Sequence, residues 1–483
     1  MRVPCLVAVL MALGLPSLSQ NGDTPRDAVV EGAWVGQLKA GAVQVRMVFQ
    51  IVRQPSGLLG GTLDVPEQGA KGIPVETVTF DTPTLTLDVK AIGGKFEGKL
   101  SADKARVTGN WRQSGGTYPL VLVRSAKPPE VRRPQEPKPP LPYAEREVTV
   151  ENPVAKVKLA GTLTVPQGVG PHPAAILISG SGAQDRDESV FGHRPFLVLA
   201  DHLTRKGIAV LRLDDRGVGG STGDLRASTS KDLAEDVKCA MDALKARSEV
   251  DPARIGLIGH SEGGIVAPMV AAARRDVAFI VLLAGTGLPG EQILYLQAAA
   301  MARAGGASEA DIAKGRAINE RIYAIARGQG SAEEVAERVR AILKQTVASM
   351  TAAEKRALGP SEDAWIEAQI RAVTSPWFRF FLTHDPRPDL RAVRCPVLAL
   401  FGEKDMQVPA KENATEAEAA LKAGGNPDAT VKIVPGVNHL FQAASTGLPT
   451  EYGLIEETIS PSVLQTISDW ILARAKRGKP AGG

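Results

Sequence analysis

From residue 143 to residue 478, short and almost purely apolar runs alternate with longer segments of helical periodicity. The runs are AAILISG (174–180), IAVLRLDD (208–215), RIGLIGH (254–260), VAFIVLLAG (277–285), PVLALFG (396–402) and ATVKIVPG (429–436). Strands that are buried on both faces have this composition, and stretches such as DLAEDVKCAMDALKAR have the period of a helix. The alternation predicts an α/β fold whose mostly parallel sheet is covered by helices on both faces.

One long interval breaks this alternation. Residues 288 to about 385 contain helical segments such as EQILYLQAAAMARA and EEVAERVRAILKQTVASM, and they contain no run of the buried-strand type. A helical insertion between two strands, near their carboxyl ends, is typical of a cap over a ligand site. We therefore expect a helical cap here.

Residues 29–125 have the pattern of an all-β domain. About eight short stretches alternate or run apolar, with Gly, Pro and Asp between them: WVGQLKA, VQVRMVFQIV, LGGTLDVP, VETVTFD, TLTLDVKA, KFEGKLS, RVTGNW and YPLVLVR. This spacing predicts an antiparallel meander that curls into a barrel-like shape. Trp34 and Trp111 are expected in its core, because large aromatic side chains dominate the packing of small domains.

Residues 126–142 contain seven prolines and separate the two patterns. This composition favours an extended, semi-rigid chain and cannot pack a core. The sequence thus predicts a linker between a β-rich domain at 29–125 and an α/β domain at 143–478.

The first twenty residues, MRVPCLVAVLMALGLPSLSQ, have the pattern of a secretory signal peptide over residues 1–19. Arg2 precedes an apolar run at 3–15, and small residues follow it. The run is shorter than the roughly 20 residues that a membrane-spanning helix needs, and no later run is long and charge-free enough to span. We expect an exported protein, periplasmic or extracellular, without an integral membrane segment once the leader is removed.

Of the three cysteines, Cys239 and Cys395 remain after the leader. Export permits a disulfide between them. The first falls in a helical pattern and the second at the start of a strand, so we expect two packed free thiols.

The overall charge and the spacing of the histidines favour neither nucleic-acid binding nor a metal site. The formal net charge of +4 is small for 483 residues, and acidic and basic residues are interspersed, which does not favour nucleic acid as a partner. The six histidines form no H-x-x-H or Cys/His cluster, so no metal site is predicted.

The pattern Gly-x-Ser-x-Gly occurs twice, around Ser261 and around Ser221. Glycine fills 49 of the 483 positions, so the string alone is weak evidence. A nucleophile elbow also requires a buried strand directly before the serine and a helix directly after it. Ser261 follows the strand IGLIG and precedes an apolar helix, whereas Ser221 lies in the loop DRGVGGSTGD with no helix behind it. We expect Ser261 to be a nucleophile and Ser221 to be structural.

An acid and a histidine follow Ser261 in the order serine, acid, histidine that α/β sheets of this type use. Asp405 comes just after the strand PVLALFG, and His439 lies in a loop after the strand VKIVPG. Both positions are at the carboxyl edge of the sheet, where open α/β sheets keep their sites. Asp405 is preferred to Glu403 because its greater distance from the strand lets it reach the histidine.

Two backbone N–H groups complete the predicted site as an oxyanion hole. One is the N–H of Glu262, the residue after the nucleophile. The other comes from the loop Ser179–Gly182, with the N–H of Ser181 as the expected donor.

Residues 145–475 resemble bacterial carboxylesterases of the α/β-hydrolase fold that are related to the prolyl-peptidase and serine-aminopeptidase branches. The resemblance rests on LAGTLTVP, ISGSGAQDRDE, LRLDDRGVGGSTG, GLIGHSEGG, LALFGEKDMQVP and VNHLFQ. It implies a Ser261–His439–Asp405 triad that forms an acyl-enzyme without a cofactor. The string GSGAQDRDE looks like that of secreted esterases with a β-rich N-terminal domain. The insertion at 288–385 departs from the pattern and suggests no particular substrate.

Charged residues of two of these strings are expected to form ion pairs that brace loops beside the site, with a direct substrate contact as the alternative. They are Asp185, Arg186, Asp187, Asp214, Asp215 and Arg216.

Several functions share this fold, so the leaving group stays open. The expected reaction is hydrolysis of small-molecule carboxylic esters with small to medium acyl groups, because the cap has few large apolar residues. A serine peptidase or aminopeptidase and a thioesterase are alternatives of the same chemistry. An alternative of another class is a binding module carried by the β-rich domain, with a vestigial hydrolase behind it. The sequence indicates no protein partner.

Overall fold

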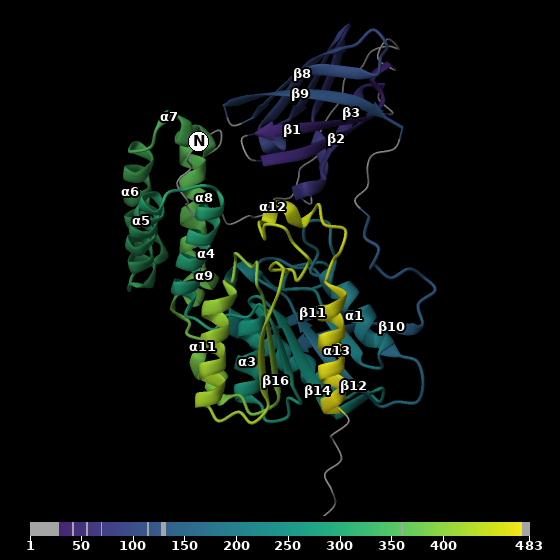
Figure 1. Cartoon of the computed structure of the whole chain (residues 1–483), viewed down its shortest axis with the longest axis vertical. Coiled ribbons are helices and arrows are strands. Elements are labelled where there is room, and N and C mark those ends of the chain that lie inside the picture. Colours follow the sequence, from purple (N-terminus) through teal and green to yellow (C-terminus); the bar gives the residue numbers. More distant parts are fainter. Residues whose placement is uncertain are drawn as a thin grey trace, which may run out of the picture.

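A computed structural model of the chain describes residues 29–475, except 41–42, 55–56, 69, 114, 127–131 and 359–360. The predicted signal peptide, residues 1–19, lies outside the described residues. Figure 1 shows the chain, with the β-rich domain above the α/β domain and the helical cap beside both.

The β-rich domain has nine strands in its described part, one more than the sequence pattern predicts. They are β1 (Gly32–Ala40), β2 (Val43–Arg53), β3 (Leu59–Val65), β4 (Ala70–Val75), β5 (Thr77–Asp81), β6 (Thr84–Val89), β7 (Gly94–Leu100), β8 (Arg106–Gln113) and β9 (Gly116–Ser125). The additional strand is β4, whose sequence AKGIPV contains Gly and Pro and does not alternate. The single stretch VETVTFD therefore spans the end of β4 and the whole of β5.

These strands form one antiparallel sheet in the order β4-β3-β2-β1-β9-β8-β7-β6-β5. Strands from the two ends of this order approach each other, β3 with β5 and β4 with β6, so that the sheet curls into an almost closed barrel. Side chains fill its interior: Trp34 and Trp111 are both fully buried there with Phe49 and Phe96. The prediction that the two tryptophans are core residues is confirmed.

The α/β domain contains an eight-stranded sheet in the order β10-β11-β13-β12-β14-β15-β16-β17. Its strands are β10 (Tyr143–Asn152), β11 (Val157–Pro166), β12 (His172–Ile178), β13 (Ala209–Leu213), β14 (Val250–His260), β15 (Ile280–Leu283), β16 (Val397–Gly402) and β17 (Ala429–Val434). β10 pairs with β11, and β11 with β13, in antiparallel fashion, and all other neighbours are parallel. The mostly parallel sheet is as predicted.

Helices cover both faces of this sheet. One face packs on α2 (Ser230–Lys245), α3 (Gly263–Ala273), α10 (Arg387–Ala392) and α11 (Ala410–Ala423). The other face packs on α1 (Pro195–Arg205) and α13 (Pro461–Ala475), and the short α12 (Pro449–Tyr452) lies below the β-rich domain (Figure 1). Because each face has its own apolar core, the central strands β12, β14, β15 and β16 are buried on both sides, as their composition predicts. The prediction is wrong for β17, which lies at the edge of the sheet and has no buried residue.

The cap is helical, as predicted, and lies between β15 and β16. Its helices are α4 (Gly290–Ala304), α5 (Glu309–Arg327), α6 (Ala332–Ala348), α7 (Ala352–Ala357), α8 (Glu362–Thr374) and α9 (Pro376–Thr383). Ser308 and Ser331 begin α5 and α6 with capping boxes, which satisfy free N–H groups of the first turn. Leu294, Tyr323 and Leu343 belong to the apolar core of the cap, which also includes Ile265 of α3.

The proline-rich segment is more than a spacer. In its described part, Arg133 donates hydrogen bonds to the carbonyl oxygens of Gly453 (2.9 Å) and Ile455 (2.7 Å). The Gln135 amide accepts the N–H of Thr458 (2.6 Å) and donates to the carbonyl of Ile459 (2.7 Å). The linker is thereby bound to the loop between β17 and α13 by polar contacts, which its composition does not reveal.

Two further predictions concern cysteines and membranes. Cys239 in α2 and Cys395 just before β16 are free thiols, as expected. No helix in the described ranges combines the length and the apolar character needed to cross a bilayer.

Candidate active site

Ser261 lies at a sharp turn between β14 and α3. The last six residues of β14 are buried, and α3 begins two residues after the serine. Ser261 has a φ of 52°, a left-handed conformation that costs a non-glycine residue about 1–2 kcal/mol. Its N–H donates to the carbonyl of Leu283 in β15 (2.8 Å), which helps to hold the strained turn. The residue is half-buried, between the buried residues His260 and Glu262.

Glycines around this turn are required by close backbone contacts. A Cβ atom on Gly259 would collide with the carbonyl of Gly263, and one on Gly263 would collide with the carbonyl of Ile178 in β12. A Cβ on Gly264 would meet the Cα atom of Gly285. The turn therefore has the geometry of a nucleophile elbow, in which the backbones pass too close for a side chain.

His439 and Asp405 meet at the carboxyl edge of the sheet. His439 Nδ1 lies 2.7 Å from Asp405 Oδ2, and both side chains are almost completely buried. The other carboxylate oxygen, Oδ1, accepts the N–H groups of Gln407 (2.8 Å) and Val408 (2.9 Å). A carboxylate held in this way keeps the proton on Nδ1, so that Nε2 carries the free electron pair of the imidazole.

Glu403, the other acid considered for this position, is exposed and points elsewhere. Its Oε2 accepts the N–H of Gly436 at 2.8 Å. Among the described residues, Ser261 Oγ has no hydrogen-bond partner, so the structure joins Asp405 to His439 but does not join His439 to Ser261. Such bonds often form only in the substrate complex.

The loop after β12 approaches the nucleophile through Gly180. A Cβ on Gly180 would lie 3.2 Å from the Cβ of Ser261. Within the described ranges, neither the N–H of Ser181 nor that of Glu262 donates to a protein acceptor. Both groups are thus available to an oxygen atom of a ligand, as the oxyanion-hole prediction requires.

Ser221, the serine of the second Gly-x-Ser-x-Gly string, has a structural role. Its Oγ donates to the carbonyl of Asp214 (2.8 Å) and accepts the N–H of Ala160 in β11 (2.9 Å). The first hydrogen bond ties its loop to the end of β13 and the second ties it to β11, which agrees with the prediction from its missing strand–helix context.

Four of the six charged residues beside the site form the expected ion pairs, whereas Asp185 and Asp215, among the described residues, accept only backbone N–H groups or a hydroxyl. Arg186 binds Asp214 through two nitrogens, Nε to Oδ1 (3.1 Å) and Nη2 to Oδ2 (2.8 Å). Arg212 pairs with Asp187 in the buried interior. These pairs lock the loop after β12 onto the end of β13.

Arg216 and Asp185 complete the network. Arg216 pairs with Asp236 of α2 (2.6 Å), while Asp185 Oδ1 accepts the N–H groups of Asp187 and Ser189. Bidentate, partly buried ion pairs of this kind make the loops beside the site rigid. Their charges are paired within the protein and are therefore not free to bind a substrate.

Two more carboxyl groups lie beside the elbow. Asp215 accepts hydrogen bonds from Ser179 Oγ and from the N–H of Gln184, both at 2.9 Å. Burial, with the negative charges of Glu262 and Glu188 in addition, raises the pKa of Asp215 to about 7. Burial also raises the pKa of Glu262, whose side chain accepts the hydroxyl of Ser230 at 2.6 Å.

The side chains of Glu188 and His260 are the part of the site that the sequence patterns did not assign. Glu188 Oε1 lies 2.8 Å from His260 Nδ1, and His260 Nε2 lies 3.1 Å from the carbonyl oxygen of His439. The only signal for this pair is that Glu188 ends the string GSGAQDRDE and His260 precedes Ser261. Nothing in the spacing shows that the two side chains meet.

No group of three or more metal-ligating side chains occurs within the described ranges.

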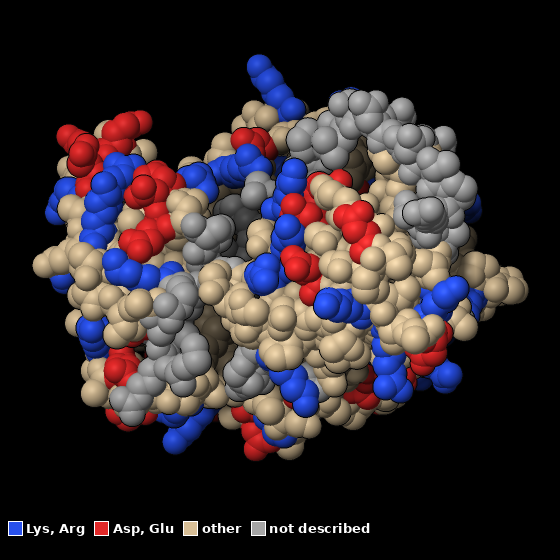
Figure 2. Space-filling view, turned by 90° about the horizontal axis from the view of Figure 1, so that it is seen from above, with Lys and Arg blue, Asp and Glu red and all other residues tan. Residues whose placement is uncertain are grey.

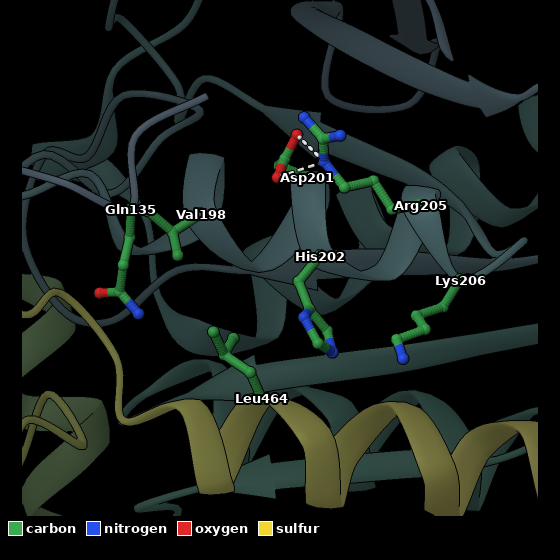
Figure 3. Close-up of a pocket in the computed structure, with 7 residues that line it drawn as sticks. All are labelled: Gln135, Val198, Asp201, His202, Arg205, Lys206 and Leu464. Carbon is green, nitrogen blue, oxygen red and sulfur yellow. Dashed lines mark hydrogen bonds and ion pairs between the residues drawn. The ribbon is translucent and has the colours of Figure 1, made fainter. Parts of the chain in front are cut away.

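A groove lies between α1 and α13 and is shown in Figure 3. It is lined by Gln135, Val198, Asp201, His202, Arg205, Lys206 and Leu464, so none of the candidate site residues belongs to it. On the face seen from above, basic and acidic side chains are interspersed (Figure 2).

The α/β domain is similar in sequence to known hydrolases. Residues 175–446 match the model of the alpha/beta hydrolase family. Esterase EstD of Thermotoga maritima is 24% identical over 332 residues, which are 68% of this chain and 68% of that protein. A putative hydrolase of Bacillus subtilis, YtaP, is 33% identical over 119 residues, or 21% of this chain and 40% of that protein.

A solved structure of an esterase from Pyrococcus furiosus is 16% identical, with a TM-score of 0.41, and the match covers 69% of this chain and 91% of that one. The family match spans more than half of the 483 residues and includes the elbow, Asp405 and His439. The chain therefore belongs to the α/β hydrolase family.

Proposed function

We propose that this protein hydrolyses carboxylic esters with Ser261 as nucleophile, His439 as general base and acid, and Asp405 as the partner of His439. The observation that supports this most is the buried hydrogen bond between His439 Nδ1 and Asp405 Oδ2 (2.7 Å). The strained elbow at Ser261 supports it further, because such turns persist where function requires an exposed nucleophile.

The chemistry follows from these positions. Ser261 Oγ attacks the acyl carbonyl while His439 Nε2 takes the hydroxyl proton, and the imidazolium is balanced by Asp405. The N–H groups of Glu262 and Ser181 stabilise the oxyanion of the tetrahedral intermediate. His439 then gives the proton to the leaving alcohol. In the second half of the reaction, His439 takes a proton from the water molecule that attacks the acyl-enzyme, and it returns this proton to Ser261 as the acid is released. No metal or organic cofactor takes part in this sequence.

The preference for esters rests on the curated relative that is named an esterase, and the preference for small to medium acyl groups rests on the cap. The largest apolar residues of α9 are Trp377, Phe378, Phe380 and Phe381. Phe378 and Phe381 are already buried in the core of the cap, which leaves few large apolar side chains for a long acyl chain.

The test compares hydrolysis of p-nitrophenyl butyrate with hydrolysis of aminoacyl-anilides, with Ser261→Ala as the background. We expect turnover of the ester only, and its loss in Ser261→Ala. Turnover of the anilides alone would make the protein a peptidase, and an ester rate that survives Ser261→Ala would remove the assigned nucleophile.

We also propose that the protein is exported after cleavage of residues 1–19. Amino-terminal sequencing of the secreted or periplasmic protein should start at Gln20. Recovery of the intact amino terminus from the cytosol alone would contradict this.

A further inference from the structure

Glu188 lies at a point where three loops of the candidate active site meet. Its Oε1 atom accepts the N–H of Gly180, in the loop after β12, at 2.7 Å. The same oxygen lies 2.8 Å from His260 Nδ1, at the end of β14 and directly before Ser261. Through His260 Nε2, which lies 3.1 Å from the carbonyl oxygen of His439, the contact extends to the loop after β17.

The number of protons in this chain of contacts is fixed by the acceptors. A backbone carbonyl only accepts, so His260 Nε2 must carry a proton to bond with His439. Glu188 Oε1 accepts from Gly180, and as a carboxylate it accepts again from His260 Nδ1–H. With the shared proton on Nδ1, His260 is an imidazolium paired with a buried carboxylate; with that proton on Glu188, both groups are neutral.

The surroundings favour the charged form of His260. Burial works against the cation, but the Glu188 charge and hydrogen bond outweigh it and raise the pKa of His260, with smaller contributions from the His439 carbonyl and Asp405. The charged or titratable groups that face His260 are Glu188 from the loop after β12, Asp405 from the loop after β16 and His439 from the loop after β17. The rings of His260 and His439 lie 4.8 Å apart between centroids.

The backbone at Glu188 is itself strained. Its φ is 53°, in the left-handed region, and its side chain is only 4% exposed. A non-glycine residue in this conformation costs about 1–2 kcal/mol and persists only where its surroundings determine it. The chain thus accepts strain to bring this carboxylate to His260 and Gly180.

We propose that Glu188 and His260 form a positioning dyad, an imidazolium–carboxylate pair that holds the backbone of His439 and of the oxyanion loop in place around Ser261. The dyad contains none of the reacting groups of the proposed mechanism and acts through the groups that it holds. This inference rests on the proposed function, because it assigns the dyad to the reaction of Ser261 and His439.

Glutamine at position 188 cannot replace the carboxylate, although it has nearly the same shape. The amide oxygen in the place of Oε1 accepts from Gly180, but a neutral His260 has a single ring proton for two acceptors, the amide oxygen and the His439 carbonyl. The amide nitrogen in that place would face the N–H of Gly180. One of the three hydrogen bonds is therefore lost in Glu188→Gln.

The kinetic test measures kcat and KM separately for p-nitrophenyl butyrate at pH 8. We expect Glu188→Gln to lower kcat by about 10²-fold, the effect of a small misplacement of catalytic groups, with KM changed less than threefold. His260→Gln, which leaves the Glu188 carboxylate without its cation, should show the same split. The matched control is His202→Gln, because His202 is a partly buried histidine on α1 whose Nε2 bonds to Ser468 Oγ (3.0 Å) outside the site. Its kcat should equal that of the unmodified protein.

A spectroscopic test separates this role from general loss of structure. The chain has six histidines, so nitrogen NMR of protein labelled at histidine can resolve each ring. We expect one imidazolium that persists at pH 8, that is absent in His260→Gln and that becomes neutral in Glu188→Gln. Thermal unfolding of each variant shows whether it is folded. If Glu188→Gln does not fold, the signal of His260 in the unmodified protein still shows whether His260 is an imidazolium.

A neutral His260 at pH 8 in the unmodified protein would overturn the proposal. An unchanged kcat in Glu188→Gln, or a loss confined to KM, would do the same. Ser261→Ala distinguishes these failures from failure of the proposed function: if it abolishes turnover while Glu188→Gln is fully active, the triad stands and the dyad falls. If Ser261→Ala keeps its ester activity, the proposed function itself falls.

Discussion

Ser261, Asp405 and His439 each lie within five residues of the end of a strand of the α/β sheet. Parallel strands bring their carboxyl ends to one edge of the sheet, so residues that are far apart in sequence reach the same place. This is why single residues could be chosen from spacing alone. Asp405 was preferred to Glu403 because it lies two residues farther from the end of its strand. In the structure, Asp405 is the acid that bonds to His439.

The first prediction at the residue scale concerns the role of that carboxylate. Asp405→Asn keeps the shape of the side chain but removes the charge that holds the proton on His439 Nδ1. We expect kcat for p-nitrophenyl butyrate to fall by about 10⁴-fold, as expected when the histidine takes the wrong tautomer. Steady-state kinetics of the purified variant measure this.

Glu403→Gln is the control for this change, because Glu403 is an exposed acid only two residues away whose carboxylate accepts the N–H of Gly436. It should retain at least half of the activity. Equal losses in the two variants would show that charge near the strand end matters, and not the bond to His439.

At the scale of elements, the loop between β17 and α13 is held from two sides. Arg133 and Gln135 of the linker bind the backbone of Gly453, Ile455, Thr458 and Ile459. In addition, His193 Nε2 lies 2.9 Å from the carbonyl oxygen of Tyr452, and its Nδ1 lies 2.9 Å from Thr458 Oγ1. Since His439 belongs to this loop, the rigidity of the loop bears on the active site.

We predict that Arg133→Ala lowers the free energy of unfolding of the α/β domain by about 2 kcal/mol, the contribution of hydrogen bonds from a charged donor to acceptors that are left unsatisfied. Urea denaturation measures the loss. Arg132→Ala is the matched control, because Arg132 is the exposed neighbour in the same segment, and its effect should stay below about 0.5 kcal/mol. Similar losses in both variants would mean that the linker is not docked.

A second prediction for this loop concerns pH. Burial, with the nearby charge of Arg133, lowers the pKa of His193 from 6.5 to about 4. The unfolded chain then binds a proton between pH 6.5 and 4 that the folded chain does not, so the contribution of His193 to stability is complete above pH 6.5 and is lost as pH falls towards 4. The loss amounts to about 3 kcal/mol.

Urea denaturation between pH 7 and pH 4 tests this dependence. His193→Gln should be less stable than the unmodified protein at pH 7, and it should lose less stability on acidification. Parallel stability curves for the two proteins across this pH range would contradict the assignment.

At the scale of the whole molecule, the periodicity of apolar residues predicted those parts of the fold that depend on local sequence pattern. The α/β sheet, the helical cap and the barrel-like domain all follow from runs of apolar residues and from their spacing. The strand β4 was missed because its residues AKGIPV do not alternate, and it exists through pairing with β3. Local propensity is a weak guide where cross-strand partners determine the strand.

The contacts that could not be predicted are polar and join distant parts of the chain. Arg133 and Gly453 are 320 positions apart, and Glu188 and His260 are 72 positions apart. Apolar patterns carry no information on which charged side chain meets which carbonyl or ring nitrogen. The bracing pairs of Arg186 and Arg216 were expected as a group, but their individual partners required the fold.

The central claim is that one serine of the whole chain is the nucleophile, and covalent labelling tests it most directly. The protein would be treated with a fluorophosphonate and analysed by intact mass, followed by peptide mapping. We predict one label per chain, located on Ser261, with no label on Ser261→Ala and normal labelling of Ser221→Ala. A label on any other serine, or full labelling of Ser261→Ala, would contradict it.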